Sequence, residues 1–370
     1  MLLKSLACSL LLALIAPACF ADENPLFESH EVLKAVLTAP IAQTYAQKSQ
    51  EIRLYFPGQW AYVDTDGETK HLQVSIRTRG HFRREHCSMP PLRLNFSKKE
   101  VKDTLFAGQD KLKLVAQCQR SNTYQQMVIL EYLAYRTYEI LSENSFKTRM
   151  LRLSYIDSDE KRDPYTAYAF VIEDDADLAK RLDLKRVKTP TVDYAALDQS
   201  SMALVQLFQF LIGNSDYSLI DVGIGDECCH NTQILRNKGK DVVDGLIPVP
   251  FDFDASGLID APYAVPPAMV PVQDVYWRYY RGLCQPREYV DAAIAQMQSK
   301  REELYALYEE LPMLDERFRK RSLRYLDGFY EVLDDPDKLE AKVFERCRRQ
   351  DLMDQTLEAE RLLEVPIGPT

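Results

Sequence analysis

Apolar and polar side chains alternate along several short runs in the first half of the chain. A period of two is typical of half-buried β-strands, because successive side chains point to opposite faces. Ahead of these runs, Val32, Leu33, Val36 and Leu37 follow helical spacing, so residues up to about 50 are predicted to be helical. Strands are predicted at residues 52–56, 72–79, 92–96, 112–116, 151–156 and 168–172.

The remaining pattern is mainly helical. A long helix is predicted at residues 124–141, and further helices follow at 176–184, at 202–212 and over most of the chain beyond Tyr276. Two short strands, at 233–236 and 246–253, interrupt them. These elements predict an α+β fold in two parts that meet near Glu173: residues 22–173 are β-rich with one main helix, and residues 174–370 are mostly helical.

The first 21 residues have the pattern of a secretory signal peptide. Lys4 precedes an apolar stretch at residues 6–16, and small residues follow at Ala18 and Ala21. We therefore expect residues 1–21 to be removed and the mature chain to be exported, to the periplasm or the cell exterior. No later stretch is apolar and long enough to predict a transmembrane segment.

The chain is acidic, with a formal net charge of −10 over 370 residues. Loss of Lys4 with the leader leaves a net charge of about −11, from 45 basic and 56 acidic side chains (45 − 56). Such a surface repels nucleic acid phosphates, so nucleic-acid binding is not expected. A site for a phosphorylated ligand would have to be locally basic.

Six cysteines remain after the leader is excluded, and an even number in an exported chain predicts disulfides. Cys87 with Cys118 is the first expected pair, because each residue borders a predicted strand of the N-terminal half. Cys228 or Cys229 with Cys284 is the second. A zinc site from Cys228, Cys229 and His230 is an alternative, although adjacent cysteines do not easily share one tetrahedral ion. The six are Cys87, Cys118, Cys228, Cys229, Cys284 and Cys347.

Asp216 is the first candidate for catalysis. It follows an apolar helix that ends at Gly213, so its carboxylate is expected in a loop held by a buried helix. That position suits a base that accepts a hydroxyl proton, although a turn aspartate bonded to nearby amides has the same pattern. Asn231 begins a strand 15 residues later (231 − 216) and is a candidate metal ligand, or a polar residue at a strand start.

Asp252 and Asp254 are the second acidic feature. They share one face of an apolar strand, about 7 Å apart along it. Two carboxylates at that spacing repel each other unless a cation or a donor lies between them. The sequence therefore predicts a metal site here, and the alternative is a strand that runs into a turn at Ser256 and Gly257.

Basic residues gather on the predicted N-terminal strands. Arg77 and Arg79 share one face before Gly80, and Arg83 and Arg84 follow. Arg guanidinium groups in such a hairpin could bind phosphates, and a solvated charged face is the alternative. Lys113 projects from a later strand, and Glu131 lies at the edge of the apolar stripe of the long helix. A Lys113–Glu131 pair would resemble the pair that orients nucleotide phosphates in kinases, and a surface ion pair is the alternative.

Standard catalytic signatures are missing from the sequence. It has neither a P-loop nor a Gly-x-Gly-x-x-Gly fingerprint, a Gly-x-Ser-x-Gly elbow or a His-Glu-x-x-His motif. With five histidines in all, a hydrolase triad has few possible bases.

The order of these segments resembles a two-lobed, protein-kinase-like fold, in particular the bacterial spore-coat CotH kinase family and, more distantly, the HipA toxin kinases. Residues 77–80 (Arg-Thr-Arg-Gly) are similar to the CotH Arg-x-Arg-Gly segment, and residues 91–96 to the strand after it. Residues 213–216 (Gly-Asn-Ser-Asp) resemble the start of the HipA catalytic loop, and residues 250–254 a metal-binding strand end. The resemblance covers residues 70–260.

The resemblance implies a role for each of these residues. Asp216 would be the catalytic base, and Asn231 with Asp252 or Asp254 would bind Mg²⁺ or Mn²⁺. Lys113 and Glu131 would orient the phosphates of ATP or another nucleotide, with Arg79 and Arg93 as rival basic groups. One departure is clear: kinase catalytic loops place the asparagine five residues after the aspartate, and here the gap is 15.

We therefore expect an exported phosphotransferase that moves a phosphoryl group from a nucleotide to a hydroxyl of a protein or an envelope glycan. The alternative is a catalytically inactive, kinase-like envelope protein that serves as a disulfide-stapled binding module.

Overall fold

The protein is described here by a computed structural model that covers residues 24–64, 66–221, 228–239 and 244–349. The predicted signal peptide lies outside the described residues. Seven strands of the N-terminal half form a closed barrel in the order β1-β2-β3-β4-β5-β7-β6. They are β1 (Leu33–Ala39), β2 (Phe56–Val63), β3 (Thr69–Thr78), β4 (Leu92–Phe96), β5 (Lys111–Val115), β6 (Thr148–Asp157) and β7 (Tyr165–Ile172).

Strand β1 closes the barrel. It pairs antiparallel with β2 and parallel with β6, so that no strand of this sheet is left at an edge. The two-lobed, protein-kinase-like fold predicted from the sequence is therefore wrong, because the N-terminal strands form a closed mixed barrel and not the open sheet of a kinase lobe. Large aromatic side chains fill the interior: Phe106 packs edge to face with Trp60 and at a tilt with Tyr62, and all three are at most 1% exposed.

The helix predicted before residue 50 is also wrong over most of its length. Residues 33–39 form β1, in which Leu33, Ala35 and Leu37 point into the barrel and alternate with more exposed residues. A short helix α1 (Ile41–Ala46) follows, and the next strand spans 56–63, beyond the predicted 52–56. The period of two in β1 prevails over the apparent helical spacing because it places its apolar residues in the barrel core.

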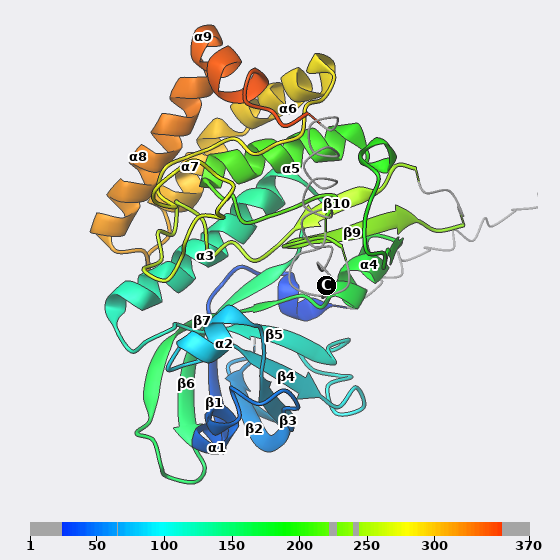
Figure 1. The fold of residues 1–370 in the computed structure, drawn as a ribbon. Coiled ribbons are helices and arrows are strands. Elements are labelled where there is room, and N and C mark those ends of the chain that lie inside the picture. Colours follow the sequence, from blue (N-terminus) through cyan, green and yellow to red (C-terminus); the bar gives the residue numbers. More distant parts are fainter. Residues whose placement is uncertain (1–23, 65, 222–227, 240–243, 350–370) are drawn as a thin grey trace, which may run out of the picture.

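Helix α3 (Asn122–Leu141) lies between the barrel and the helices of the C-terminal half (Figure 1). Its buried apolar residues belong to the same core as those of α5 (Gln199–Ile212), whose residues from 202 to 212 are all buried. The other helices are α2 (Phe82–His86), α4 (Asp175–Arg181), α6 (Arg287–Ser299), α7 (Arg301–Glu309), α8 (Glu316–Leu333) and α9 (Pro336–Leu339).

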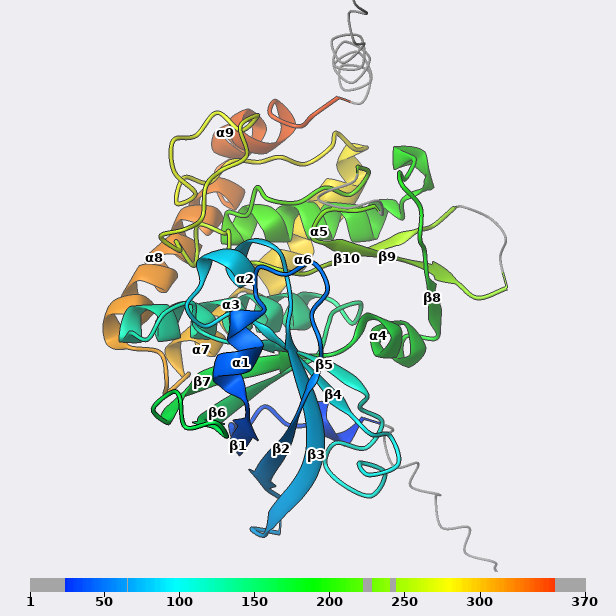
Figure 2. The same ribbon diagram turned by 60° about the horizontal axis from the view of Figure 1, so that its bottom comes forward.

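A second, three-stranded sheet has the order β10-β9-β8 and lies beside α5 (Figure 2). Its strands are β8 (Leu184–Arg186), β9 (Thr232–Asn237) and β10 (Ile247–Pro250). Short turns complete the fold at η1 (Pro25–Phe27), η2 (Tyr194–Ala196) and η3 (Glu340–Phe344). Because β9 and β10 pair antiparallel, the start of one strand lies beside the end of the other.

The described part of the chain contains three disulfides. Cys87–Cys118 confirms the first predicted pair. Cys284 is bonded to Cys347, so the predicted bond from Cys284 to Cys228 or Cys229 is wrong. Cys228 and Cys229 are bonded to each other, which leaves neither thiol to bind the zinc ion considered as an alternative.

Within the described ranges, every helix is too short or too polar to cross a lipid bilayer.

Candidate functional site

Asn231 lies just before β9 and Asp252 just beyond β10, which ends at Pro250, so the predicted strand at 246–253 with Asp252 and Asp254 on one face is wrong past Pro250. Thr232 is opposite Pro250 in the register, and one residue beyond, the Phe251 N–H donates to the Asn231 carbonyl at 3.0 Å. Asn231 and Asp252 both have positive φ, 53° and 61°. This left-handed conformation costs a non-glycine residue on the order of 1 kcal/mol, and such strain is often found at functional sites.

The loop that carries Asp216 is held from two sides. Helix α5 ends at Gly213 in the left-handed conformation, which turns the chain towards the β9–β10 pair. The Asn214 side chain accepts the Asp216 N–H at 2.9 Å. Arg281 donates to the carbonyls of Ser215 and Tyr217, at 2.6 and 2.9 Å. These bonds fix the backbone on both sides of Asp216.

The carboxylate of Asp216 accepts hydrogen bonds from two neighbours. Asn231 Nδ2 is 3.1 Å from Asp216 Oδ2 and 2.7 Å from the Asp216 carbonyl. His230 Nε2 is 2.8 Å from Asp216 Oδ1. The Asp216 side chain is still 36% exposed, so a ligand can reach it from solvent. The structure thus brings Asp216 and Asn231 into contact despite the 15 residues between them.

His230 is a site residue that the sequence reasoning missed. It was considered only as a zinc ligand, although its position beside Asn231 was the signal that could have placed it near Asp216. The hydrogen bond with Asp216 raises the pKa of His230, against the effect of burial, and the charge of Asp252 adds to the rise. A protonated imidazole is therefore favoured beside the two carboxylates.

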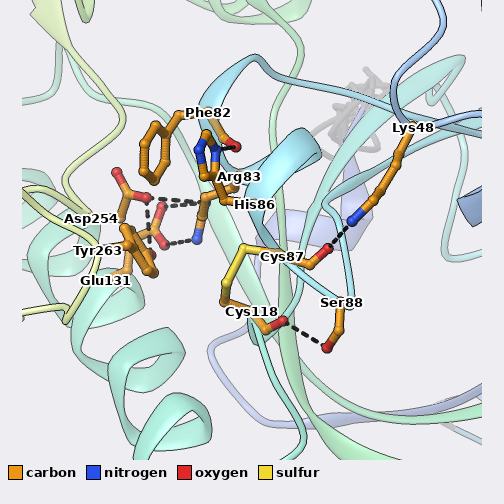
Figure 3. Close-up of a disulfide and its surroundings, with 10 residues drawn as sticks. All are labelled: Lys48, Phe82, Arg83, His86, Cys87, Ser88, Cys118, Glu131, Asp254 and Tyr263. Atoms are coloured by element: carbon orange, nitrogen blue, oxygen red, sulfur yellow. Dashed lines mark hydrogen bonds and ion pairs between the residues drawn. A yellow bond between two sulfur atoms is a disulfide. The ribbon is translucent and has the colours of Figure 1, made fainter.

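Asp254 belongs to a neighbouring buried cluster (Figure 3). Arg83 of α2 lies between two carboxylates, with its Nε 3.0 Å from Asp254 Oδ2 and its Nη1 3.0 Å from Glu131 Oε2. The Tyr263 hydroxyl also donates to Asp254, at 3.1 Å. Burial raises the pKa of Asp254 to about 6 and that of Glu131 to about 8, although Arg83 opposes both shifts.

The charge of Asp252 acts both on His230 and on the buried cluster of Asp254, Glu131 and Arg83. Its charge raises the pKa of His230 on one side and contributes to the raised pKa of Asp254 and Glu131 on the other. Its backbone N–H donates to the Tyr135 hydroxyl of α3 at 2.9 Å. Of the two candidate aspartates, Asp252 is the one whose carboxylate is not ion-paired in the described part of the chain.

The basic residues form a row on the outer face of the barrel. Arg77, Arg93 and Lys113 occupy paired positions on β3, β4 and β5, with leucine and isoleucine neighbours pointing inward. Arg79 lies just beyond β3. Burial lowers the pKa of Arg79, and the charge of Asp252 opposes that shift.

The predicted Lys113–Glu131 pair does not form. Glu131 binds Arg83, and Lys113 binds Asp175 at the start of α4. Arg93 binds the preceding residue, Asp174, at 2.8 Å. These carboxylates neutralise two of the basic residues.

The residues present fit a hard cation only in part. Within the described ranges, no group of three or more His, Cys, Asp or Glu side chains is arranged to hold a metal ion. Asn231 uses its Nδ2 atom for its hydrogen bonds, which leaves the amide oxygen, and Asp252 offers a carboxylate. Two oxygen ligands suffice for Mg²⁺ when phosphates and water complete the octahedron.

No protein-family model matches the chain, and no curated protein or solved structure matches it either. The resemblance to CotH and HipA kinases therefore stays a prediction made from motifs.

Proposed function

We propose that the chain is an exported phosphotransferase, which moves a phosphoryl group from ATP or another nucleotide to a hydroxyl of a protein or an envelope glycan. The observation that carries the proposal is the contact of Asp216 with Asn231 and His230, where the charge of Asp252 also acts on His230. The leader-like sequence of residues 1–21 and the three disulfides support export.

In the proposed reaction, Asp216 is the general base. The acceptor hydroxyl loses its proton to the Asp216 carboxylate as its oxygen bonds to the terminal phosphorus, and the bond from that phosphorus to the nucleoside diphosphate breaks. Each carboxylate oxygen has two acceptor sites, so Asp216 can receive the hydroxyl proton while it keeps its bonds to His230 and Asn231. Those two bonds hold the carboxylate in one orientation.

Charge neutralisation falls to the residues around Asp216. Asn231 and Asp252 would hold Mg²⁺ or Mn²⁺, which would supply positive charge at the transferred phosphates. Arg79, Arg93 and Lys113 would bind phosphate oxygens from the barrel side. A phosphate competes for Arg93 and Lys113 with Asp174 and Asp175, so binding would exchange one set of ion pairs for another.

A second candidate is a non-catalytic binding module. The observation that favours it is that Arg93 and Lys113 are already paired with carboxylates. On this alternative, the ion pairs stabilise the junction of the barrel with α4, and no nucleotide binds there.

Thermal unfolding with and without ATP plus Mn²⁺ separates the two candidates. A ligand that binds only the native state raises the melting temperature. The phosphotransferase proposal predicts a rise for the wild-type chain and its loss in Asp252→Asn. Asp183→Asn is a matched control, because Asp183 also has a positive φ, 55°, but pairs with Lys238 away from the site. An unchanged wild-type melting temperature would support the binding module instead.

A further inference from the structure

A groove of about 450 Å³ lies on the C-terminal half, outside the site of Asp216. Its wall comes from the loop that follows Val270, from η3 and from the turn just after η3. Aromatic and basic side chains dominate it, and the described residues that line it include no aspartate or glutamate. They are Phe210, Pro271, Val272, Gln273, Trp277, Arg278, Tyr279, Tyr280, Lys342 and Arg346.

The floor of the groove is rigid. Arg278 donates to the carbonyls of Phe210, Leu211 and Tyr325 at 2.7 to 3.0 Å, and its guanidinium group lies 4.1 Å from the centre of the Tyr325 ring. Tyr280 and Phe210 are buried beneath it. A surface that is ordered before binding loses less entropy when a ligand arrives.

The rim, by contrast, exposes apolar and basic side chains. The Trp277 side chain is 65% exposed, and Met269 nearby in the loop is 71% exposed. Lys342 and Arg346 are exposed, and the guanidinium group of Arg346 lies over the Tyr279 ring at 5.7 Å. Two cations with no carboxylate beside them in the lining are unusual on a chain with a net charge of −10.

We propose that this groove binds an acidic peptide segment of a partner protein. Exposed tryptophan, tyrosine and arginine are the residues that contribute most binding energy at protein interfaces. Lys342 and Arg346 would pair with carboxylates of the peptide, and Trp277 with Pro271 and Val272 would receive an apolar side chain. The Gln273 amide can donate to a peptide carbonyl. The proposal does not depend on the proposed phosphotransferase activity.

The fluorescence of Trp277 can be used to measure peptide binding. The chain has two tryptophans, and Trp60 is fully buried in the barrel, so quenching of tryptophan emission by acrylamide reports on Trp277. The probe is a synthetic nonapeptide of glutamates around two leucines, and the control peptide has glutamine in place of glutamate. We expect the acidic peptide to reduce the quenching constant of the full chain at least twofold, and the control peptide to leave it unchanged.

Variants test whether the groove is responsible. Lys342→Gln combined with Arg346→Gln should weaken the binding of the acidic peptide at least tenfold. The matched control, Lys34→Gln combined with Lys99→Gln, removes two exposed lysines from the barrel side and should bind as the wild type does. Equal binding by the two double variants, or no protection by the acidic peptide, would overturn the proposal.

Two other occupants of the groove would give different results in the quenching experiment. The chain beyond Arg349 is itself acidic, with Asp351, Asp354 and Glu358. If Trp277 is already shielded from acrylamide in the full chain without peptide, the groove belongs to another segment of the chain and the proposal is overturned. Protection by an oligosaccharide of uronic acids but not by the peptide would overturn it in favour of a carbohydrate.

Discussion

His230 Nε2 lies 2.8 Å from Asp216 Oδ1, and this contact connects the segment after α5 to the residues just before β9. It places a titratable group against the carboxylate that is proposed to accept a hydroxyl proton. A protonated His230 places a positive charge beside that carboxylate. The charge of His230 therefore bears on both the stability and the proposed chemistry of the site.

The contact predicts a pH dependence of stability. The hydrogen bond with Asp216 raises the pKa of His230 above its ordinary value of 6.5. The stabilisation is therefore complete below about pH 6.5 and is lost as the pH rises through the raised pKa. We expect His230→Asn to lower the free energy of unfolding by about 1 kcal/mol at pH 5 and by less at pH 9.

Urea unfolding at both pH values measures this difference. The control is His71→Asn, which replaces an exposed histidine of β3 and should lower the stability equally at both pH values, if at all. A loss from His230→Asn that grows with pH would contradict the assignment.

Arg83 is predicted to be the most costly single charge to remove. Arg83→Met leaves Glu131 and Asp254 buried without their cation, and such a change destabilises a fold by about 3–5 kcal/mol. The loss should be smaller at pH 5 than at pH 9, because the two pKa values are about 8 and about 6 and both carboxyl groups are mostly protonated at pH 5.

Chemical denaturation at the two pH values tests this. Arg77→Met is the matched control, since Arg77 also lies near the barrel surface but contacts the Tyr55 ring. An Arg83→Met variant no less stable than Arg77→Met at pH 9 would show that the cluster is not an ion pair.

The disulfides should contribute unequally. Cys87–Cys118 spans 31 residues and Cys284–Cys347 spans 63. The entropy of loop closure gives each about 4 kcal/mol, slightly more for the longer loop. Cys228–Cys229 joins adjacent residues and closes no loop, so its loss should cost little by this mechanism. Paired Cys→Ser variants and peptide mapping under non-reducing conditions test both the energies and the pairing. A Cys229–Cys284 peptide would contradict the fold.

Much of the local structure could be predicted from the sequence, because it depends on short-range patterns. The strand at 92–96 was predicted with the bounds that the structure has, and the long helix begins two residues earlier than predicted. Barrel closure could not be predicted, since it depends on β1 pairing with β6, more than 100 residues away. The short apolar run from Val32 to Leu37 fits both periods, and only its partners decide between them.

The candidate site was only partly predictable. Asp216 follows the end of α5, and Asn231 comes just before β9, the next element along the chain. The order of elements predicted from the sequence indicated that these two residues could meet. The partner of Lys113 is Asp175, at the start of the next helix, and not Glu131. Arg83 contacts Glu131 instead, and the Cys87–Cys118 disulfide ties the end of α2 to the segment that precedes α3 (Figure 3). Side-chain pairing across elements depends on such tertiary contacts.

The central claim is that Asp216 is the base of a phosphotransferase, and transfer of label from γ-labelled ATP measures it most directly. The acceptor is a dephosphorylated envelope fraction, with Mn²⁺ present, and the variants are Asp216→Asn and the neighbouring control Asp221→Asn. The account predicts that the wild type and Asp221→Asn transfer label and that Asp216→Asn loses at least a hundredfold in rate. Equal transfer by Asp216→Asn and the wild type would contradict it.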